Sequence, residues 1–375
     1  MATIEDIALC MTPGLGTQGA AHLIECFSSA KNIFSASQSE LSHFAKLSTN
    51  VAKKIVNKEG FSAAEREIKH CQRYDITPIS VCDALYPPLL LEAGDRPHVI
   101  YVKGNTNILT SKALSIVGTR KLTPYGERAC NSIVENLASR VKKFVVVSGL
   151  AFGADAAAHR AALGYDVPTI AVLPNSLPGV TPAQNTALAR DIVDSGGALV
   201  SELHSQTKNN GQLYLSRNRI IAAFSALTLL VESPLRGGSM ATARMAHDYA
   251  RIVGALPGRI TDSMSRGCNM LIRDGVAQAI TSGEDIIREM MWDIEEGLLN
   301  EPTPRRASRP QIELSADERG LLCCFRGDDP LHISTLQELS ALSAGELSSL
   351  LVTLEIAGAI RVLPGNLYER LIDLT

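Results

Sequence analysis

The chain has 375 residues with 45% hydrophobic content and a formal net charge of −3. This composition excludes a disordered chain, because it supplies apolar material for roughly two or three folded units. The chain does not open on a charged segment followed by an apolar one, and no run of about 18 apolar residues occurs, so we expect a soluble, cytoplasmic protein without a membrane segment. The eight cysteines form no C-x-x-C pair and have no partner histidines at zinc spacing, so we predict reduced thiols and no metal site.

Residues 1–75 are predicted to form a helical domain of the helix-hairpin-helix or SAM-like type. Apolar residues recur at helical spacing on both sides of residues 12–16, which read TPGLG. In helix-hairpin-helix modules such a turn presents backbone N–H groups to a phosphate, but the same turn can also simply end one helix and begin the next. The sequence leaves both interpretations open.

Residues 76–294 are predicted to form a Rossmann-like α/β domain. Short apolar runs alternate there with helical stretches, which is typical of a parallel sheet that is buried on both faces and joined by right-handed crossovers. Ligands of such sheets bind beyond the carboxyl ends of the strands, so we expect function in the loop that follows each run. The six predicted strands are residues 113–117, 144–147, 168–173, 198–200, 227–231 and 252–256.

The last part of the chain is predicted to be a linker, residues 295–312, followed by a winged-helix domain, residues 313–375. The linker is rich in Pro and Arg and lacks periodicity. Three short helical stretches then precede a hairpin that turns at residues 364–366, which is the winged-helix order. The third helix of such domains usually enters the major groove, but here it carries Glu346 and Glu355 and no Arg or Lys. Protein contact is therefore at least as well supported as DNA contact.

Positive charge is concentrated in the second half of the α/β domain. The net charge alone argues against nonspecific binding of nucleic acid. Between residues 205 and 275, however, there are nine Lys and Arg residues against four acidic ones, and eight of the nine are Arg. A guanidinium suits phosphate oxygens and base edges better than an ammonium group does. A solvated helix face is the simpler explanation of any single Arg, but a cluster among glycines favours an anion site.

Two strand-end loops carry glycine turns. The first contains Gly118, Thr119, Arg120 and Lys121, where glycine allows close approach of the backbone and Arg can bind a phosphate. The second contains Gly149 in a G-x-x-x-G spacing rather than the G-x-G-x-x-G fingerprint, and the acidic residue expected about 20 residues later is missing. A dinucleotide site is therefore disfavoured, and we expect no cofactor. Ordinary strand-to-helix turns look similar, so each signal alone is weak.

Asp155 and His159 lie four residues apart at the start of the following helix, on one face, where they could form an acid–base pair. No Ser, Cys or third ligand is spaced to join them. We predict a structural role instead, in which Asp155 is favoured at the helix N-terminus while His159 hydrogen-bonds to it and braces the loop.

Two further motifs open helices in the Arg-rich region. One combines two guanidinium groups, an amide and the N–H groups of a helix N-terminus, and it is the most specific local signal in the chain. The other is a Gly-Gly-Ser turn after a strand, which is an anion nest without a Walker lysine, so nucleotide hydrolysis is not supported. We expect these two motifs and the two glycine turns to contact nucleic acid, through Gly118, Thr119, Arg120, Lys121, Gly149, Arg217, Asn218, Arg219, Gly237, Gly238 and Ser239.

Together these motifs resemble those of the DprA/Smf family of DNA-processing proteins. The similarity spans residues 113–288 and covers S-I-V-G-T-R, S-G-L-A-x-G-x-D-A-A-A-H, R-N-R-I-I-A, G-S-x-x-T-A and R-G-C-N-x-L-I-R-D-G in that order. The helical N-terminal part and the winged-helix tail resemble the family's additional domains more loosely. The chain departs from the family pattern at Tyr214-Leu215-Ser216, where the family has F-P before R-N-R, and at residues 180–185. The ring of Tyr214 could still stack on a base.

The resemblance implies an extended Rossmann-like domain that forms a homodimer, binds single-stranded DNA and loads the RecA recombinase during natural transformation. It also implies a phosphate pocket at Arg120, at Arg217 to Arg219 and at the Gly238-Ser239 turn, without catalytic residues.

Two other classes of function remain possible. An enzyme that binds or cleaves a nucleotide derivative would need a carboxylate beside the glycine nest, for which Glu202 and Glu232 at strand ends are the only good candidates. A transcription regulator would read duplex DNA through the winged helix, which the acidic third helix disfavours.

Overall fold

The computed structural model describes residues 1–44, 47–207, 211–294, 314–325 and 330–371. The chain divides into two compact units, Met1–Pro304 and Arg305–Thr375, which are described separately below. The predicted linker, residues 295–312, lies outside the described residues. The predicted division of the first unit at residue 75 stays a prediction.

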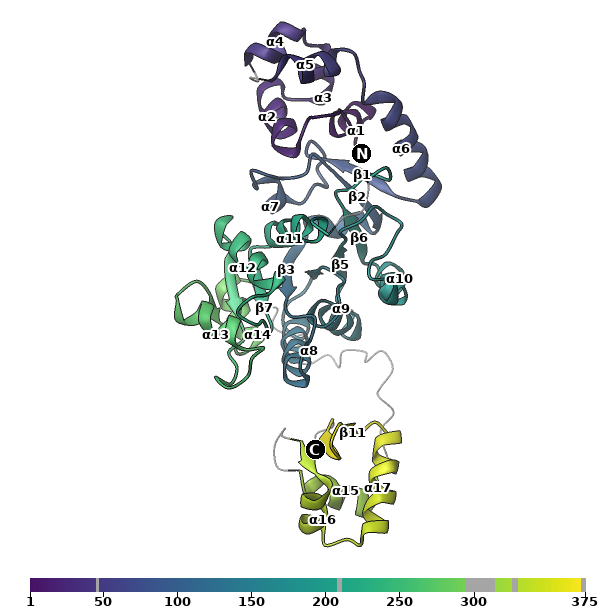
Figure 1. Cartoon of the computed structure of the whole chain (residues 1–375), viewed down its shortest axis with the longest axis vertical. Coiled ribbons are helices and arrows are strands. Elements are labelled where there is room, and N and C mark those ends of the chain that lie inside the picture. Colours follow the sequence, from purple (N-terminus) through teal and green to yellow (C-terminus); the bar gives the residue numbers. More distant parts are fainter. Residues whose placement is uncertain (45–46, 208–210, 295–313, 326–329, 372–375) are drawn as a thin grey trace. The chain divides into compact units, whose positions relative to one another are not determined.

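A nine-stranded sheet forms the centre of the first unit, in the order β1-β2-β6-β5-β4-β3-β7-β8-β9 (Figure 1). All six predicted strands are confirmed, and each is parallel to its neighbours within that set. They are β3 (Lys112–Val117), β4 (Phe144–Ser148), β5 (Thr169–Val172), β6 (Ala198–Ser201), β7 (Leu227–Leu230) and β8 (Ile252–Ala255). Three strands were not predicted. Of these, β1 (Thr77–Ser80) and β2 (Val99–Gly104) extend the sheet in antiparallel pairing beyond β6, and β9 (Gln278–Ala279) pairs parallel with β8.

Alternate residues of the central strands enter two different cores. Leu114 and Ile116 of β3 pack with one set of helices, whereas Ala113 and Val117 pack with the other. This alternation follows from the two-residue period of a strand and accounts for the continuous apolar runs in the sequence. The first set comprises α8 (Pro124–Ala138), α9 (Ala154–Gly164) and α14 (Gly283–Met290). The second comprises α11 (Leu213–Phe224), α12 (Gly238–Asp248) and α13 (Arg266–Arg273).

The N-terminal residues are helical, as predicted, and bury a small core of their own that includes Leu9, Leu23, Ile33 and Ile55. The TPGLG turn lies between α1 and α2, where Gly14 adopts a positive φ of 85° that glycine tolerates without strain. The helices are α1 (Ile4–Cys10), α2 (Thr17–Phe27), α3 (Ala30–Ser35), α4 (Gln38–Phe44), α5 (Thr49–Val56) and α6 (Phe61–Tyr74). Two further helices, α7 (Pro88–Leu91) and α10 (Thr186–Asp194), complete the first unit beside the sheet.

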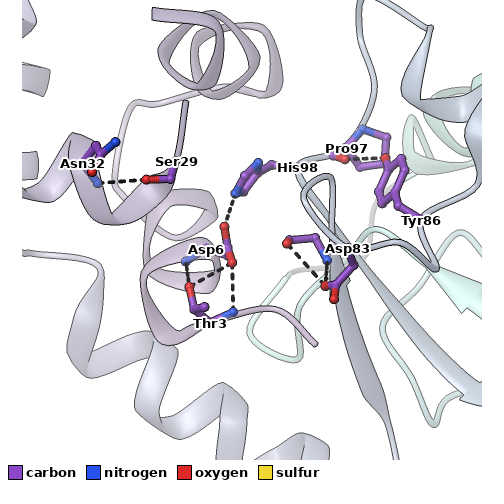
Figure 2. A network of polar contacts seen from close by, with 9 residues as sticks. Thr3, Asp6, Ser29, Asn32, Asp83, Tyr86, Pro97 and His98 are labelled. Carbon is purple, nitrogen blue, oxygen red and sulfur yellow. Dashed lines mark hydrogen bonds and ion pairs between the residues drawn. The ribbon is translucent and has the colours of Figure 1, made fainter. Parts of the chain in front are cut away.

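A buried polar contact joins the N-terminal helices to the sheet (Figure 2). Asp6 in α1 accepts hydrogen bonds from the backbone N–H and hydroxyl of Thr3, which caps the helix, and its other oxygen lies 2.8 Å from Nε2 of His98, just before β2. Burial by itself would raise the pKa of Asp6, but the hydrogen bonds from His98 and Thr3 hold it below its usual value. The carboxylate therefore stabilises both the helix terminus and its attachment to the sheet.

The second unit has the predicted order of three helices and a hairpin. These are α15 (Ala316–Cys323), α16 (Ile333–Ser340) and α17 (Ala344–Ile356), followed by β11 (Ile360–Leu363) and β12 (Leu367–Arg370). A two-residue strand that was not predicted, β10 (Leu331–His332), completes a small sheet in the order β10-β12-β11. Among the described residues no single helix has the length and apolar composition of a membrane span, although the bent pair of α16 and α17 together meets that criterion.

Candidate nucleic-acid interface

A cavity of about 310 Å³ opens at the carboxyl ends of the central strands. The loops that follow β3, β4 and β7 all contribute to its lining. In the sheet, β3 lies between β4 and β7, so the chain leaves β3 toward one side and later returns on the other. Open α/β sheets bind ligands at such a switch point because the flanking loops diverge there. The cavity therefore lies where the sequence predicted function.

Three helices begin at this cavity. The first turns of α9, α11 and α12 contribute Asp155, Tyr214 and Gly238 to the lining. The N–H groups of a first helical turn have no partners within the helix and carry a partial positive charge, so their convergence favours an anion.

The loop after β3 combines a tightly packed glycine with an exposed arginine. A Cβ atom on Gly118 would lie 2.6 Å from the Cβ of Ala154, so only glycine fits there. Thr119 donates its backbone N–H to the carbonyl of Glu232 at 2.7 Å, which ties this loop to the one after β7. Arg120 is exposed, and its guanidinium carbon lies 5.4 Å from the centre of the Tyr214 ring. Lys121 is exposed too but does not line the cavity.

Arg217 lines the cavity but is held as a structural brace. Its side chain is buried, with 4% exposure, and Nη1 donates to the carbonyls of Gly149 at 2.5 Å and Val172 at 2.6 Å. A Cβ atom on Gly149 would lie 1.9 Å from this nitrogen, so glycine at that position makes room for the guanidinium. Burial lowers the pKa of Arg217, and the nearby carboxyl of Asp155 opposes that shift. Its expected contact with phosphate stays a prediction.

The structure separates the three residues of the Arg217-Asn218-Arg219 motif. Asn218 lines the cavity and accepts a hydrogen bond from Nε of Arg217 at 3.1 Å. Arg219 does not line it; its guanidinium forms an ion pair with Glu202 and lies 3.8 Å from Asp95. Successive residues of a helix point about 100° apart, so two arginines separated by one residue face nearly opposite directions. The expectation that both arginines face one pocket is therefore wrong.

The Gly-Gly-Ser turn begins α12 and lines the cavity as expected. A Cβ atom on Gly238 would meet nothing within 4 Å, so packing does not require glycine there. The hydroxyl of Ser239 donates to the hydroxyl of Ser233 at 2.9 Å, and Ser233 in turn donates to a backbone carbonyl. The serine proton is thus already used, and the donors that remain for an anion are the backbone N–H groups.

The expected hydrogen bond between Asp155 and His159 is not formed. Asp155 accepts from the backbone N–H of Ala151 at 3.2 Å and braces the loop after β4 directly. His159 instead lies 2.7 Å from the hydroxyl of Thr169, which itself donates to the carbonyl of Val146, so Nδ1 of the imidazole carries the proton. Complete burial lowers the pKa of His159 to about 3 and keeps it neutral. Burial also raises the pKa of Asp155, although the charge of Arg217 opposes this.

The two carboxylates considered for catalysis lie elsewhere. Glu232 accepts hydrogen bonds from the backbone N–H and hydroxyl of Thr123 at 2.9 and 2.6 Å and fixes the start of α8. Glu202 is paired with Arg219. Neither lines the cavity.

Seven residues of the lining were not among those expected from the sequence, and they are Val117, Ala151, Gly211, Leu215, Ile221, Pro234 and Thr242. Leu215, next to Tyr214 and half exposed, and Thr242, one turn after Gly238 on α12, both line the cavity. Thr242 belongs to the G-S-x-x-T-A motif, and its helical spacing from Gly238 could have predicted it. Leu215 is marked in the sequence only as part of a departure from the family pattern.

Comparison with known proteins agrees with this fold. Residues 77–291 match the family model of DNA recombination-mediator protein A, and residues 305–366 match the DprA winged helix domain. Protein Smf of Escherichia coli is 36% identical over 292 residues, which cover 76% of this chain and 75% of that protein. The DNA processing protein DprA of Streptococcus pneumoniae is 35% identical over 210 residues, which cover 56% of this chain and 73% of that protein.

Two solved structures are also similar. The X-ray structure of Streptococcus pneumoniae DprA matches with a TM-score of 0.67 and 28% identity, covering 77% of this chain and 98% of that one. DNA processing protein A of Helicobacter pylori, whose structure concerns its mode of binding single-stranded DNA, matches with a TM-score of 0.52 and 29% identity, covering 58% of this chain and 96% of that one. The chain therefore belongs to the DprA/Smf family of DNA-processing proteins, with a DprA winged-helix domain after its Rossmann-like domain.

Proposed function

We propose that this protein binds single-stranded DNA at the cavity and does not act on it chemically. The observation that carries the proposal is the combination of an exposed, ring-stacked Arg120 with the open Gly238 turn around one cavity at the switch point of the sheet. The solved Helicobacter pylori relative, which binds single-stranded DNA, supports this assignment.

The phosphate would be held mainly by backbone groups. The first turn of α12 offers N–H groups to an anion, and nothing fills the space in front of Gly238. Arg120 adds an exposed positive charge at the rim, whereas Arg217 supplies a buried one.

The bases would contact the apolar side of the rim. Tyr214 presents a ring that already stacks on Arg120, and Leu215 beside it is 50% exposed. Stacking on an aromatic ring tolerates any base and requires the base to be unpaired. This favours single-stranded over duplex DNA and a weak dependence on sequence.

The rival function is an enzyme that binds or cleaves a nucleotide derivative. Among the described residues that line the cavity, Asp155 is the one carboxylate, so such an enzyme would depend on it. Asp155 accepts from the backbone N–H of Ala151, which explains its presence as a loop brace. We therefore favour a protein without catalytic activity.

The wider role rests on family membership. We propose that the protein acts in the cytoplasm as a homodimer formed through its Rossmann-like domain, and that it loads the RecA recombinase on incoming single-stranded DNA during natural transformation.

Titration of labelled single-stranded and duplex oligonucleotides over a series of salt concentrations tests the proposal. We expect tighter binding of the single strand, with affinity that falls steeply with salt. Arg120→Ala should make the slope of log K against log salt shallower by about 0.7, the value of one lost single-strand phosphate contact. Arg273→Ala, which removes an exposed arginine paired with Asp274, is the matched control and should leave the slope unchanged.

Equal or stronger binding of the duplex would contradict the proposal. Release of a base or phosphate from a panel of nucleotides, lost in Asp155→Asn, would establish the rival enzyme instead.

A further inference from the structure

A second, open groove of about 520 Å³ lies beside the cavity. It shares Gly237 and Gly238 with the cavity, so the two are separated only by this side-chain-free turn. Its other lining residues come from the same loop and from α12, and they are Leu235, Arg236, Met240, Ala241 and Arg244.

Two arginines in this groove have no partner. Arg236 and Arg244 are both exposed, and within the described part of the chain neither forms a hydrogen bond or an ion pair. Some other arginines of the same unit are paired, among them Arg219 with Glu202 and Arg251 with Glu92.

No carboxylate lines the groove among the described residues, so nothing offsets the two positive charges there. Like charges beside one groove repel each other, and an anion between them removes that cost. No hydrogen bond or ion pair among the described residues involves these two guanidinium groups, whereas a ligand phosphate would bind them.

The route from cavity to groove is open to a polynucleotide backbone. Gly237 and Gly238 place no side chain between them, and the Cβ position of Gly238 is empty. The small side chain of Ala241 also lines the groove, and the half-exposed Leu235 offers an apolar surface to a sugar or base. A strand with one phosphate in the cavity would pass over this turn and bring a neighbouring phosphate to the arginines.

We propose that the groove of Arg236 and Arg244 is a second phosphate site for the same single strand, continuous with the cavity. This inference rests on the proposed function and deepens it. It assigns the path of the DNA strand from the cavity to the groove, and it names two residues that contact the DNA backbone without reading bases.

The test compares three variants of the full chain with the wild type, using labelled oligothymidine of about twenty nucleotides over a series of salt concentrations. Arg236→Ala/Arg244→Ala should weaken binding and make the slope of log K against log salt shallower by about 1.4, since each lost phosphate contact removes about 0.7. Gly238→Ala should weaken binding by obstructing the cavity and leave the groove's arginines in place. Arg273→Ala/Arg288→Ala removes the same net charge from exposed arginines that are paired with Asp274 and Asp285 and should bind as the wild type does.

Each outcome decides a different question. Absence of single-strand binding by the wild type would overturn both the proposed function and the groove. A normal salt slope for Arg236→Ala/Arg244→Ala, together with weakened binding by Gly238→Ala, would overturn the groove and leave the proposed function intact. An equal loss in the Arg273→Ala/Arg288→Ala control would show that net charge, and not the groove, sets the affinity.

Discussion

Arg217 is the residue whose role changes most between the sequence and the structure, and its replacement gives a sharp prediction. From the sequence we predict that Arg217 is a free phosphate ligand. In the structure it is buried, and its Nη1 donates hydrogen bonds to two carbonyls at strand ends. Arg217→Ala would leave the carbonyls of Gly149 and Val172 without that donor and Asp155 without the nearby positive charge. The change therefore acts on the folded unit itself.

The size of the effect follows from these contacts. A hydrogen bond to a charged group contributes about 1.5–3 kcal/mol, and breaking a buried charge network costs about 3–5 kcal/mol. We expect Arg217→Ala to lower the free energy of unfolding by about 3–5 kcal/mol. Arg120→Ala, the matched control at the exposed rim, should lower it by less than about 0.5 kcal/mol.

Urea unfolding followed by tryptophan fluorescence measures this directly. The chain has one tryptophan, Trp292, which is buried in the same unit with its ring centre 5.6 Å from that of Phe144. Its emission therefore reports unfolding of the unit that contains Arg217. Full stability of Arg217→Ala combined with a loss of DNA affinity would refute the brace and restore the free phosphate ligand.

Three further changes have effects that the structure predicts. Gly149→Ala should destabilise the first unit by about 1–3 kcal/mol or more, because its Cβ would lie 1.9 Å from Nη1 of Arg217; a chemical denaturation midpoint equal to that of the wild type would contradict this. Glu232→Ala should lower the free energy of unfolding by about 1.5–3 kcal/mol, because Thr123 loses its acceptor, and calorimetry measures this. The same variant should leave any trace nucleotide turnover unchanged, which a turnover assay checks. The folded-state pKa of Asp6 lies below its unfolded value, so its stabilisation is present above the unfolded pKa and is lost as pH falls through the folded one. Melting temperatures from neutral to acidic pH should therefore fall less for Asp6→Asn than for the wild type, and parallel curves would rule this out.

The sequence predicts the parallel part of the sheet well because each strand there is a continuous apolar run buried on both faces. The sequence does not predict β1 and β2, because an alternation of strands and helices implies parallel pairing, whereas these two strands pair antiparallel. It does not predict β9 either, because that strand has only two residues. The winged-helix order is predicted because turn residues separate its elements clearly.

The candidate site is predicted as a set of loops but not as a set of side-chain roles. Gly118, Arg120 and Gly238 line one cavity as expected, because parallel strands bring their carboxyl ends to one edge. Side-chain direction is a different matter. Arg219 pairs with Glu202, and His159 contacts Thr169 rather than Asp155. Glu202 and Thr169 lie on a strand or at its end, and the sequence does not show how close that strand lies to the helix.

The proposed function requires that a DNA phosphate occupies the cavity in front of the first turn of α12. The most direct test is the affinity of Gly238→Ala for single-stranded oligothymidine, measured beside its unfolding free energy. Apart from its chain neighbours and the backbone of its own helix, a methyl group there meets nothing within 4 Å, and alanine is at least as good a helix former as glycine, so stability should not fall. We expect Gly238→Ala to bind clearly more weakly while it stays as stable as the wild type. Unchanged affinity would contradict this and place the phosphate elsewhere.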